Sequence, residues 1–184
     1  AKSLDTGVNI VAIGYQAGDA LTSGENNIAI GKNALGAEDT HDFNIAIGSN
    51  SLAAQNAGAD AYNVAIGHNA GTNVTTGIKN TIIGGLAGDQ LADADFNVAV
   101  GYGSLSTDDL GSKSTAVGTF ALEAQNYATA TDSHNTAIGY FAGNQITTGT
   151  LNTLIGGLAG DAITDGDSNV AVGHTALGQE TRGD

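Results

Sequence analysis

Histidine and acidic residues are the side chains in this sequence that could act as acids, bases or metal ligands. Their spacing favours no catalytic site. No histidine pair has the i, i+4 spacing of zinc hydrolases, and there is no nucleophile elbow or phosphate-binding loop. The acid pair Asp108-Asp109 has no apolar segment beside it that would indicate a pocket. We therefore expect no enzyme and no catalytic residue, with glycoside hydrolysis by two carboxylates from different chains as the alternative. The histidines are His41, His68, His134 and His174.

Two acidic segments raise the question of calcium. Residues 84–91 and 156–163 loosely match the calcium β-roll pattern G-G-x-G-x-D-x-U, with Asp89 and Asp161 at the acidic position. The fourth position is Ala in both, and the motif does not recur in tandem. Calcium takes six or more oxygen ligands, and one Asp per coil supplies few of them. We therefore predict no cofactor and no metal, with calcium at these two residues as the alternative.

Aromatic and imidazole side chains form a second group of candidates, for binding rather than catalysis. Several follow a recurring glycine, at a position whose residue type otherwise varies freely. Exposed aromatic rings stack on sugars or on protein partners, and lateral packing between chains is the alternative interpretation. The candidates for surface binding are Tyr62, Tyr127, Tyr102, Tyr140, His68 and His174.

A sequence repeat predicts the strands and turns that position these residues. The pentapeptide Asn-x-Ala-x-Gly recurs along the chain, and its final glycines, here called corner glycines, lie 17 residues apart except for intervals of 19 and 21. Such self-similarity is typical of a solenoid. We expect an all-β protein, a β-solenoid of the β-roll or β-helix type with about ten 17-residue coils, in a single domain over residues 1–184. The corner glycines are Gly14, Gly31, Gly48, Gly67, Gly84, Gly101, Gly118, Gly139, Gly156 and Gly173.

The three residues before each corner glycine predict a short strand that is apolar on both faces. The first and third are β-branched in all ten coils and share one face, because side chains alternate along a strand. The middle residue is Ala in eight coils, and the exceptions Ile82 and Leu154 precede Gly-Gly pairs that we expect to compensate for them. One face can line the coil and the other needs a cover. A second copy is the simplest cover, and small Ala side chains would permit its close approach.

Two further columns predict how the interior is filled and how the turns are satisfied. Four residues after the corner glycine stands either Gly or Leu, and each such Gly is followed three residues later by an apolar residue. Four residues before the corner glycine, eight coils have Asn. We interpret these amides as a stacked ladder that satisfies turn backbone groups, with a polar binding stripe as the alternative. They are Asn27, Asn44, Asn63, Asn80, Asn97, Asn135, Asn152 and Asn169.

A longer period of four coils, first 70 and then 72 residues, lies above the short one. It places the two lengthened segments, 53–62 and 123–134, at equivalent positions. Insertions in solenoids form loops on one face, which is often the binding face. We therefore expect binding first at these two segments.

The chain carries 19 acidic and 5 basic side chains, a formal charge of −14. This balance argues against nucleic acid and against an anionic membrane surface. No run approaches the roughly 20 apolar residues of a membrane span, so we expect no membrane insertion. The acids all lie in the arcs between repeats or at the termini, and we interpret them as a solvated outer surface that keeps an extended rod soluble.

Residues 135–143, Asn-Thr-Ala-Ile-Gly-Tyr-Phe-Ala-Gly, with Thr-Thr-Gly at 147–149, resemble the repeats of phage tail fibres and related surface fibres. The Ala-Ile-Gly element is also similar to the head repeats of trimeric autotransporter adhesins, which are trimeric left-handed β-rolls with a shorter coil. The resemblance covers nearly the whole chain. It implies a parallel homotrimer, which agrees with a strand that needs a cover.

The resulting prediction is a structural segment of a phage tail fibre or similar appendage, in the virion or outside the cell. Its partners would be its own copies, adjoining fibre or virion proteins, and a glycan or protein receptor on the host surface. A bacterial cell-surface adhesin or filament subunit would share the fold. An ice-binding solenoid would need a flat Thr array, and its Thr column, which Val and Ile interrupt, is one we expect to be buried. That column contains Thr81, Thr115, Thr136 and Thr153.

Overall fold

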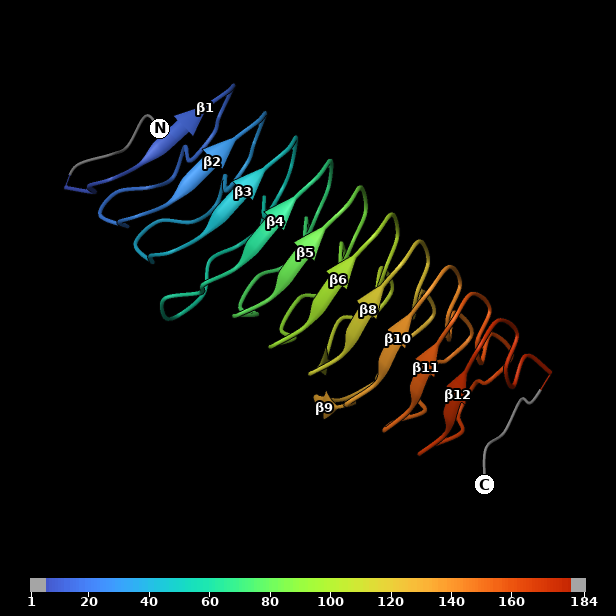
Figure 1. Ribbon diagram of the computed structural model, residues 1–184. Helices are drawn as coiled ribbons and strands as arrows, with labels where there is room; N and C mark the ends of the chain where they lie inside the picture. The colour runs from blue at the N-terminus through green and yellow to red at the C-terminus, as the bar shows by residue number, and fades with distance from the viewer. Residues whose placement is uncertain (1–5, 180–184) are drawn as a thin grey trace.

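The computed structural model describes residues 6–179, which form one continuous stack of coils (Figure 1). Ten strands of three residues form a parallel sheet in the order β1-β2-β3-β4-β5-β6-β8-β10-β11-β12. Each strand ends directly before a corner glycine. The predicted β-solenoid with ten coils of about 17 residues is therefore confirmed. The strands are β1 (Val11–Ile13), β2 (Ile28–Ile30), β3 (Ile45–Ile47), β4 (Val64–Ile66), β5 (Thr81–Ile83), β6 (Val98–Val100), β8 (Thr115–Val117), β10 (Thr136–Ile138), β11 (Thr153–Ile155) and β12 (Val170–Val172).

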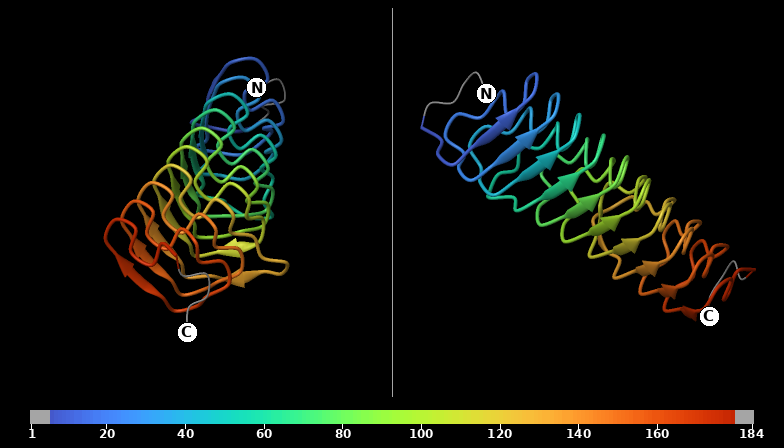
Figure 2. Two further views of the ribbon diagram at one scale, coloured as in Figure 1. Left: turned by 90° about the vertical axis from the view of Figure 1, so that its right-hand side faces the viewer. Right: turned by 45° about the horizontal axis from the view of Figure 1, so that its top comes forward.

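Neighbouring strands pair in the register that the repeat dictates, so equivalent residues stack on one another. Ala29 pairs with Ala46, and Val117 pairs with Ile138 across the longest interval. The lengthened coils therefore keep the register and accommodate their extra residues outside the sheet. In the second of them, β9 (Thr131–Asp132) forms a separate parallel pair with β7 (Gly111–Ser112) of the coil before it. Figure 2 shows the coils nearly superposed when the molecule is viewed towards one end.

The strands turn their middle residue inward and their β-branched residues outward. Ala46 is fully buried, whereas the β-branched Ile83 keeps 36% of its surface exposed. The expectation that the Ala face would meet a second copy is therefore wrong. The cause is the small cross-section of the coil, in which Leu and Ile from the opposite side already fill the interior and leave room only for a methyl group on the strand. The Thr column also faces outward, contrary to the expectation that it is buried.

The interior is filled from one of two positions, as the sequence predicts. Leu35 and Leu52 are fully buried where the fourth residue after the corner is Leu, and Leu21 and Val74 are fully buried in coils that have Gly there. The backbone is left-handed in both cases, with φ near +50° at Leu35 and +58° at Gly71. Leu rarely adopts this conformation. Burial of the whole side chain, a gain of about 2 kcal/mol, offsets the strain.

The larger residues Ile82 and Leu154 are compensated at different glycines from those expected. A Cβ atom on Gly71 or Gly88 would lie 3.0 or 3.4 Å from Ile82 side-chain atoms. Gly143 and Gly160 stand in the same relation to Leu154. The compensating glycines are therefore those four residues after the corner, in the same coil and in the coil before it. The Gly-Gly pairs instead lie at the outer corner.

The corner glycines allow the coils to stack closely. All ten have φ between +127° and +144°, a region that favours glycine. A Cβ atom on Gly84 would lie 2.5 Å from the carbonyl oxygen of Gly101 in the next coil. Gly is required here both by the backbone conformation and by the short distance between coils.

The Asn column forms a ladder inside the solenoid. The side-chain oxygen of Asn63 accepts a hydrogen bond from the backbone N–H of Asn80 at 2.8 Å, and that of Asn80 accepts one from Asn97 at 2.9 Å. The Asn80 amide nitrogen also donates to the carbonyl of Ala94 at 2.7 Å. These bonds satisfy turn backbone groups that are shielded from water. The ladder is interrupted at Ser114, which takes the place of Asn.

Candidate functional site

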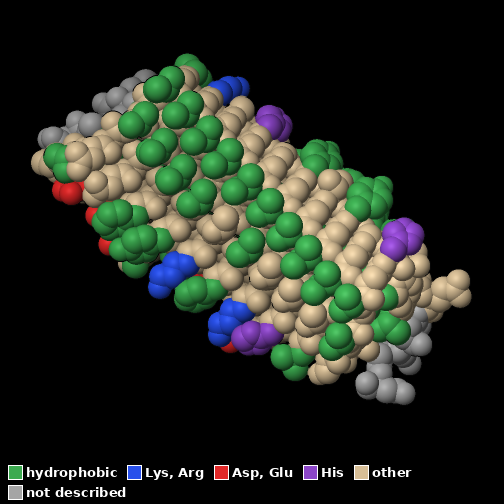
Figure 3. Space-filling view, viewed as in Figure 1, with side chains coloured by type: hydrophobic (Ala, Val, Ile, Leu, Met, Phe, Trp, Pro, Cys, Tyr) green, Lys and Arg blue, Asp and Glu red, His purple; other side chains and the backbone are tan. Residues whose placement is uncertain are grey.

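The most extensive candidate site is the outward face of the ten-stranded sheet. Its two columns of side chains consist only of Val, Ile and Thr. They form two rows that run the length of the molecule over the strands (Figure 3). Ile66, Ile83 and Ile138 in the middle of the rows keep 37%, 36% and 40% of their surface exposed. Soluble proteins rarely expose large contiguous apolar patches, so this uncharged face is a candidate interaction surface.

One border of this face is a column of residues that lie five before each corner glycine, which we call the entry ladder. Each has a left-handed backbone conformation, although none is glycine. Some successive side chains contact one another. Phe43 stacks on Tyr62 with ring centroids 4.8 Å apart, and the Lys79 ammonium lies 5.1 Å from the centre of the Phe96 ring. The entry ladder consists of Asn9, Asn26, Phe43, Tyr62, Lys79, Phe96, Lys113, His134, Leu151 and Ser168.

On the other side of the corner glycines, the surface changes its chemistry along the molecule. In the N-terminal half, Asn33, Asn50 and Asn69 form an amide ladder with hydrogen bonds of 3.1 and 3.0 Å. In the C-terminal half, four rings pack together, with centroid separations of 5.4, 5.2 and 4.5 Å between successive rings. This aromatic cluster consists of Tyr102, Phe120, Phe141 and Tyr140.

The aromatic cluster depends on small residues beside it. A Cβ atom on Gly103 would lie 2.6 Å from the Phe120 ring, and one on Gly85 would lie 3.4 Å from the Tyr102 ring. Tyr102 and Tyr140 at the two ends remain 49% and 59% exposed. Two of the residues predicted for surface binding are therefore brought together in one cluster.

The other residues predicted for surface binding are separate from this cluster. Tyr62 is exposed in the entry ladder, and His68 and His174 are exposed at distant corners of the stack. The surface prediction is wrong for Tyr127, which is buried inside the second lengthened coil. Its hydroxyl donates to the Gly149 carbonyl at 2.7 Å, and burial raises its pKa.

Two carboxylates lie inside the solenoid, which the sequence analysis missed. Glu38 and Asp108 are fully buried, although we expected all acids in the arcs to be solvated. Burial raises the pKa of Asp108, contrary to the expectation that nothing perturbs this acid pair. A signal is present in the sequence. In the coils that have Leu four after the corner, the residue three further on is Glu38, Gln55, Asp108 or Gln125 instead of an apolar residue.

Asp108 belongs to a closed hydrogen-bond network. One carboxylate oxygen accepts from the Gly111 backbone N–H at 2.9 Å, and the other accepts from the Gln125 side-chain amide at 2.6 Å. The same Gln125 nitrogen donates to the Ser114 hydroxyl at 2.8 Å, and the Gln125 oxygen accepts from Asn135 at 2.9 Å. Both carboxylate oxygens of Asp108 are thus satisfied by neutral donors.

The calcium candidates Asp89 and Asp161 lie in the coils of β5 and β11, which are separated in the sheet by the coils of β6, β8 and β10. Burial raises the pKa of Asp89, and its carboxylate lies 3.4 Å from the Gln90 amide nitrogen. Asp161 lines a surface hollow with Thr175 and Gly178. Within residues 6–179, the grouping of three acidic or histidine side chains close enough to share an ion is elsewhere, at Glu38, Asp39 and His41.

The lengthened segments 53–62 and 123–134 lie at the same edge of the solenoid, next to β4 and at β9 (Figure 1). Their tips, residues 58–60 and 128–130, are exposed. Gln55, Ala57 and Ala61 of the first segment are buried. Each segment thus contributes both to the interior and to the surface.

No helix within residues 6–179 has the length and apolarity of a membrane span. No family model, curated protein or solved structure matches this chain. The functional argument therefore rests on the geometry and chemistry of the surfaces described above.

Proposed function

We propose that the protein is a shaft segment of an extracellular fibre, such as a phage tail fibre, in which three parallel copies pack their β-branched faces together. The observation that carries this proposal is the outward face of Val, Ile and Thr. It is long, flat and free of charge, and the acids lie elsewhere in the coil. An isolated coil stack would leave this face in water along its whole length.

The energy available from this face is sufficient for association. Burying the exposed third of an Ile or Val side chain contributes on the order of 0.5–1 kcal/mol. The sixteen Val and Ile positions of the face contribute on the order of 8–16 kcal/mol. Association costs about 4–15 kcal/mol in lost translation, rotation and side-chain freedom. The upper part of the range for the face exceeds this cost, so the face can supply the energy that an oligomer needs.

The two columns of the face and the resemblance to trimeric fibres support a parallel three-fold arrangement. Each copy presents two columns of side chains. Around a three-fold axis, the first column of one copy lies beside the second column of the next, so both columns are covered in a closed ring. A parallel arrangement also keeps equivalent coils at the same height and presents three copies of each exposed ring, such as Tyr102 and Tyr140, for attachment through several weak contacts.

The mass of the protein in solution tests this proposal. Light scattering on the intact chain should give about 55 kDa, three times the 18.2 kDa of one chain. Ile83→Lys, in the middle of the face, should lower the mass to that of one chain, because a buried unpaired ammonium is costly. Gln90→Lys adds the same charge on an exposed arc and serves as the matched control.

A monomeric wild-type protein at micromolar concentration would contradict the trimer, and so would an Ile83→Lys protein that remains a trimer. A bacterial cell-surface adhesin would use the same shaft. A phage tail fibre and a bacterial adhesin differ in the sequence that flanks the solenoid, since an adhesin requires a membrane anchor.

Ice binding is a second candidate, because the Thr column lies on the outside of a flat and regular sheet. Thr81, Thr115, Thr136 and Thr153 share the face with Val and Ile in rows that repeat at each coil. Ice binding needs this face exposed, whereas the trimer needs it covered. A thermal-hysteresis measurement on the protein separates the two functions, since activity in a monomer would favour ice binding and its absence in a trimer would favour the shaft.

A further inference from the structure

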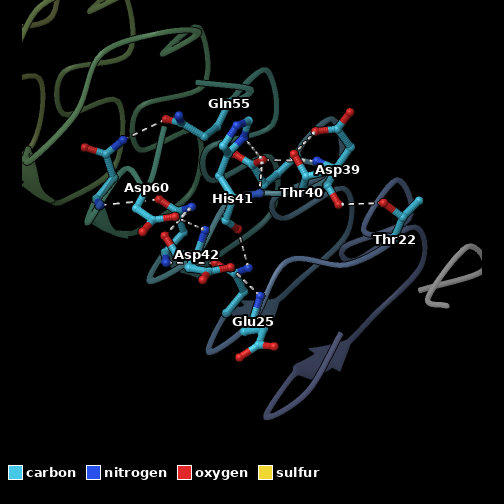
Figure 4. A network of polar contacts seen from close by, with 12 residues as sticks. Thr22, Glu25, Asp39, Thr40, His41, Asp42, Gln55 and Asp60 are labelled. Carbon is cyan, nitrogen blue, oxygen red and sulfur yellow. Dashed lines mark hydrogen bonds and ion pairs between the residues drawn. The ribbon is translucent and has the colours of Figure 1, made fainter. Parts of the chain in front are cut away.

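We propose that Glu38, Asp39 and His41 form a binding site for a divalent transition-metal ion, with Zn²⁺ as the best match. These residues lie in the arc between β2 and β3. One ligand atom of each lies within 4.8 Å of the others. Figure 4 shows Asp39, Thr40 and His41 gathered in one group with Gln55 from the next coil.

The floor of the site is the buried carboxylate of Glu38. One of its oxygens accepts hydrogen bonds from the backbone N–H groups of Asp39 and His41, both at 3.1 Å, and lies 2.8 Å from the imidazole Nδ1 of His41. The other oxygen, Oε2, is buried and has no hydrogen-bond partner among residues 6–179. Buried charges in proteins are paired or coordinate metals, so an oxygen in this state indicates a missing partner.

In the second four-coil unit, the carboxylate at the equivalent position accepts hydrogen bonds at both oxygens. Asp108 is the equivalent of Glu38, and Gln125 is the equivalent of Gln55. Asp108 receives the Gln125 amide at 2.6 Å, which completes its carboxylate. The Gln55 amide nitrogen makes no such bond and is itself buried without a partner. The first unit therefore keeps both the buried carboxylate and the Gln side chain, but not the hydrogen bond between them.

A pair of substitutions between the two units places an imidazole at this position. In the second unit, the residue equivalent to His41 is Gly111, where a Cβ atom would lie 2.0 Å from Asp108 Oδ2 and 2.7 Å from the Tyr127 ring. In the first unit, Ala57 replaces that Tyr. His41 has the space that Tyr127 occupies in the second unit, and it directs a nitrogen at Glu38.

The ligand set favours zinc over calcium. One imidazole nitrogen and two carboxylates match the ligands of zinc sites in which a water molecule takes the fourth position, whereas calcium takes oxygen ligands only. Asp39 is half-buried and the His41 side chain is 20% exposed, so the site opens to solvent on the side of these two residues. The formal charge of −14 also favours cations near the surface.

Calorimetric titration of the full chain with ZnCl₂, after removal of metals by chelator, tests the proposal. We expect one zinc ion per chain. Asp39→Asn and His41→Gln should each weaken binding by at least about tenfold, as loss of a ligand does. His68→Gln is the matched control, because His68 is exposed and lies outside this grouping. With Co²⁺ in place of Zn²⁺, the wild-type protein should show the visible absorption of a tetrahedral site, and His41→Gln should not.

Two results would overturn the site. One is wild-type protein that binds no zinc at concentrations up to 100 times that of the chain. The other is a His68→Gln protein that loses as much affinity as His41→Gln. The melting temperature in chelator shows whether each variant is folded, and Asp39→Asn keeps the test valid if His41→Gln does not fold. The oligomer mass is measured on the same samples, so the zinc site and the trimer succeed or fail independently.

Discussion

At the scale of single residues, burial decides the behaviour of side chains that look alike in the sequence. Asp108 and Asp109 are adjacent, but Asp108 points into the solenoid and is fully buried, whereas Asp109 is half-buried. Burial raises the pKa of Asp108 above its usual 3.8, and the hydrogen bond from Gln125 only partly offsets this effect. The folded protein therefore binds a proton at Asp108 more tightly than the unfolded chain does.

This difference predicts a pH dependence of stability. For a carboxyl group whose folded pKa is raised, the stabilising contribution is present below the unfolded value near 3.8 and is lost as the pH rises through the folded value. Asp108→Asn has no ionisable carboxyl group at this position, so it does not lose this contribution as the pH rises. We expect the free energy of unfolding of Asp108→Asn, relative to wild type, to increase between pH 4 and pH 7 in urea titrations.

The control for this experiment is Glu25→Gln, which removes a carboxylate from an exposed position. It reports the effect of a lower net charge without the effect of burial. An equal pH trend in Asp108→Asn and Glu25→Gln would show that general charge repulsion, and not burial of Asp108, causes the change.

At the scale of the coil, the sequence predicted the position of each strand and corner but not the direction in which the strand faces. Alternation shows which residues share a face. It does not show which face is inside when both are apolar. That choice depends on the volume of the coil interior, which Leu35, Leu91 and their equivalents fill from the opposite side. The sequence shows these residues, but not their proximity to the strand.

The candidate sites were predictable to different degrees for the same reason. The β-branched columns were visible from periodicity alone. Tyr127 was assigned to the surface because the lengthened segment was treated as a loop, whereas the structure folds part of it inward. The cluster at Glu38 was missed because an acid in an arc is usually solvated. Its burial depends on the neighbouring coil, which the repeat alone does not describe.

A prediction at this scale concerns Ile82. Ala occupies the same position in eight coils, so Ile82→Ala restores the residue that is typical of the repeat. We nevertheless expect it to lower the free energy of unfolding by about 2–5 kcal/mol, because Gly71 and Gly88 cannot fill the cavity. Urea unfolding measures this change. Leu177→Ala, at a side chain that is 40% exposed, is the control and should cost less than half as much. A neutral Ile82→Ala would contradict the packing described for β5.

At the scale of the whole molecule, the structural unit is four coils and not one. Deleting residues 85–156 removes one such unit and joins Gly84 to Gly157, which is followed by the same Leu-Ala-Gly-Asp sequence. We expect the shortened protein to keep its fold, because the coils brought together occupy equivalent positions in the four-coil unit. Circular dichroism and thermal melting test this expectation.

Deleting residues 85–118 removes only two coils and serves as the comparison. It places Leu122 where Gly88 now lies beside Ile82. The added volume costs about 1–3 kcal/mol through overpacking. We expect this protein to melt at a lower temperature than the four-coil deletion, although it loses fewer residues. The opposite order would show that the coils are interchangeable.

The outward face has a consequence for how copies align. Because its rows repeat at every coil, two copies displaced by one coil along the axis would meet almost the same Val, Ile and Thr side chains. The apolar contact energy between copies would therefore change little if one copy slipped by one coil along the axis. The entry ladder would change on such a slip, because Phe43, Tyr62, Lys79 and Phe96 each differ from the residue in the next of these coils. In a bundle of parallel copies, the outward face would supply the adhesion. The irregular columns at its borders would set the axial register of one copy against the next.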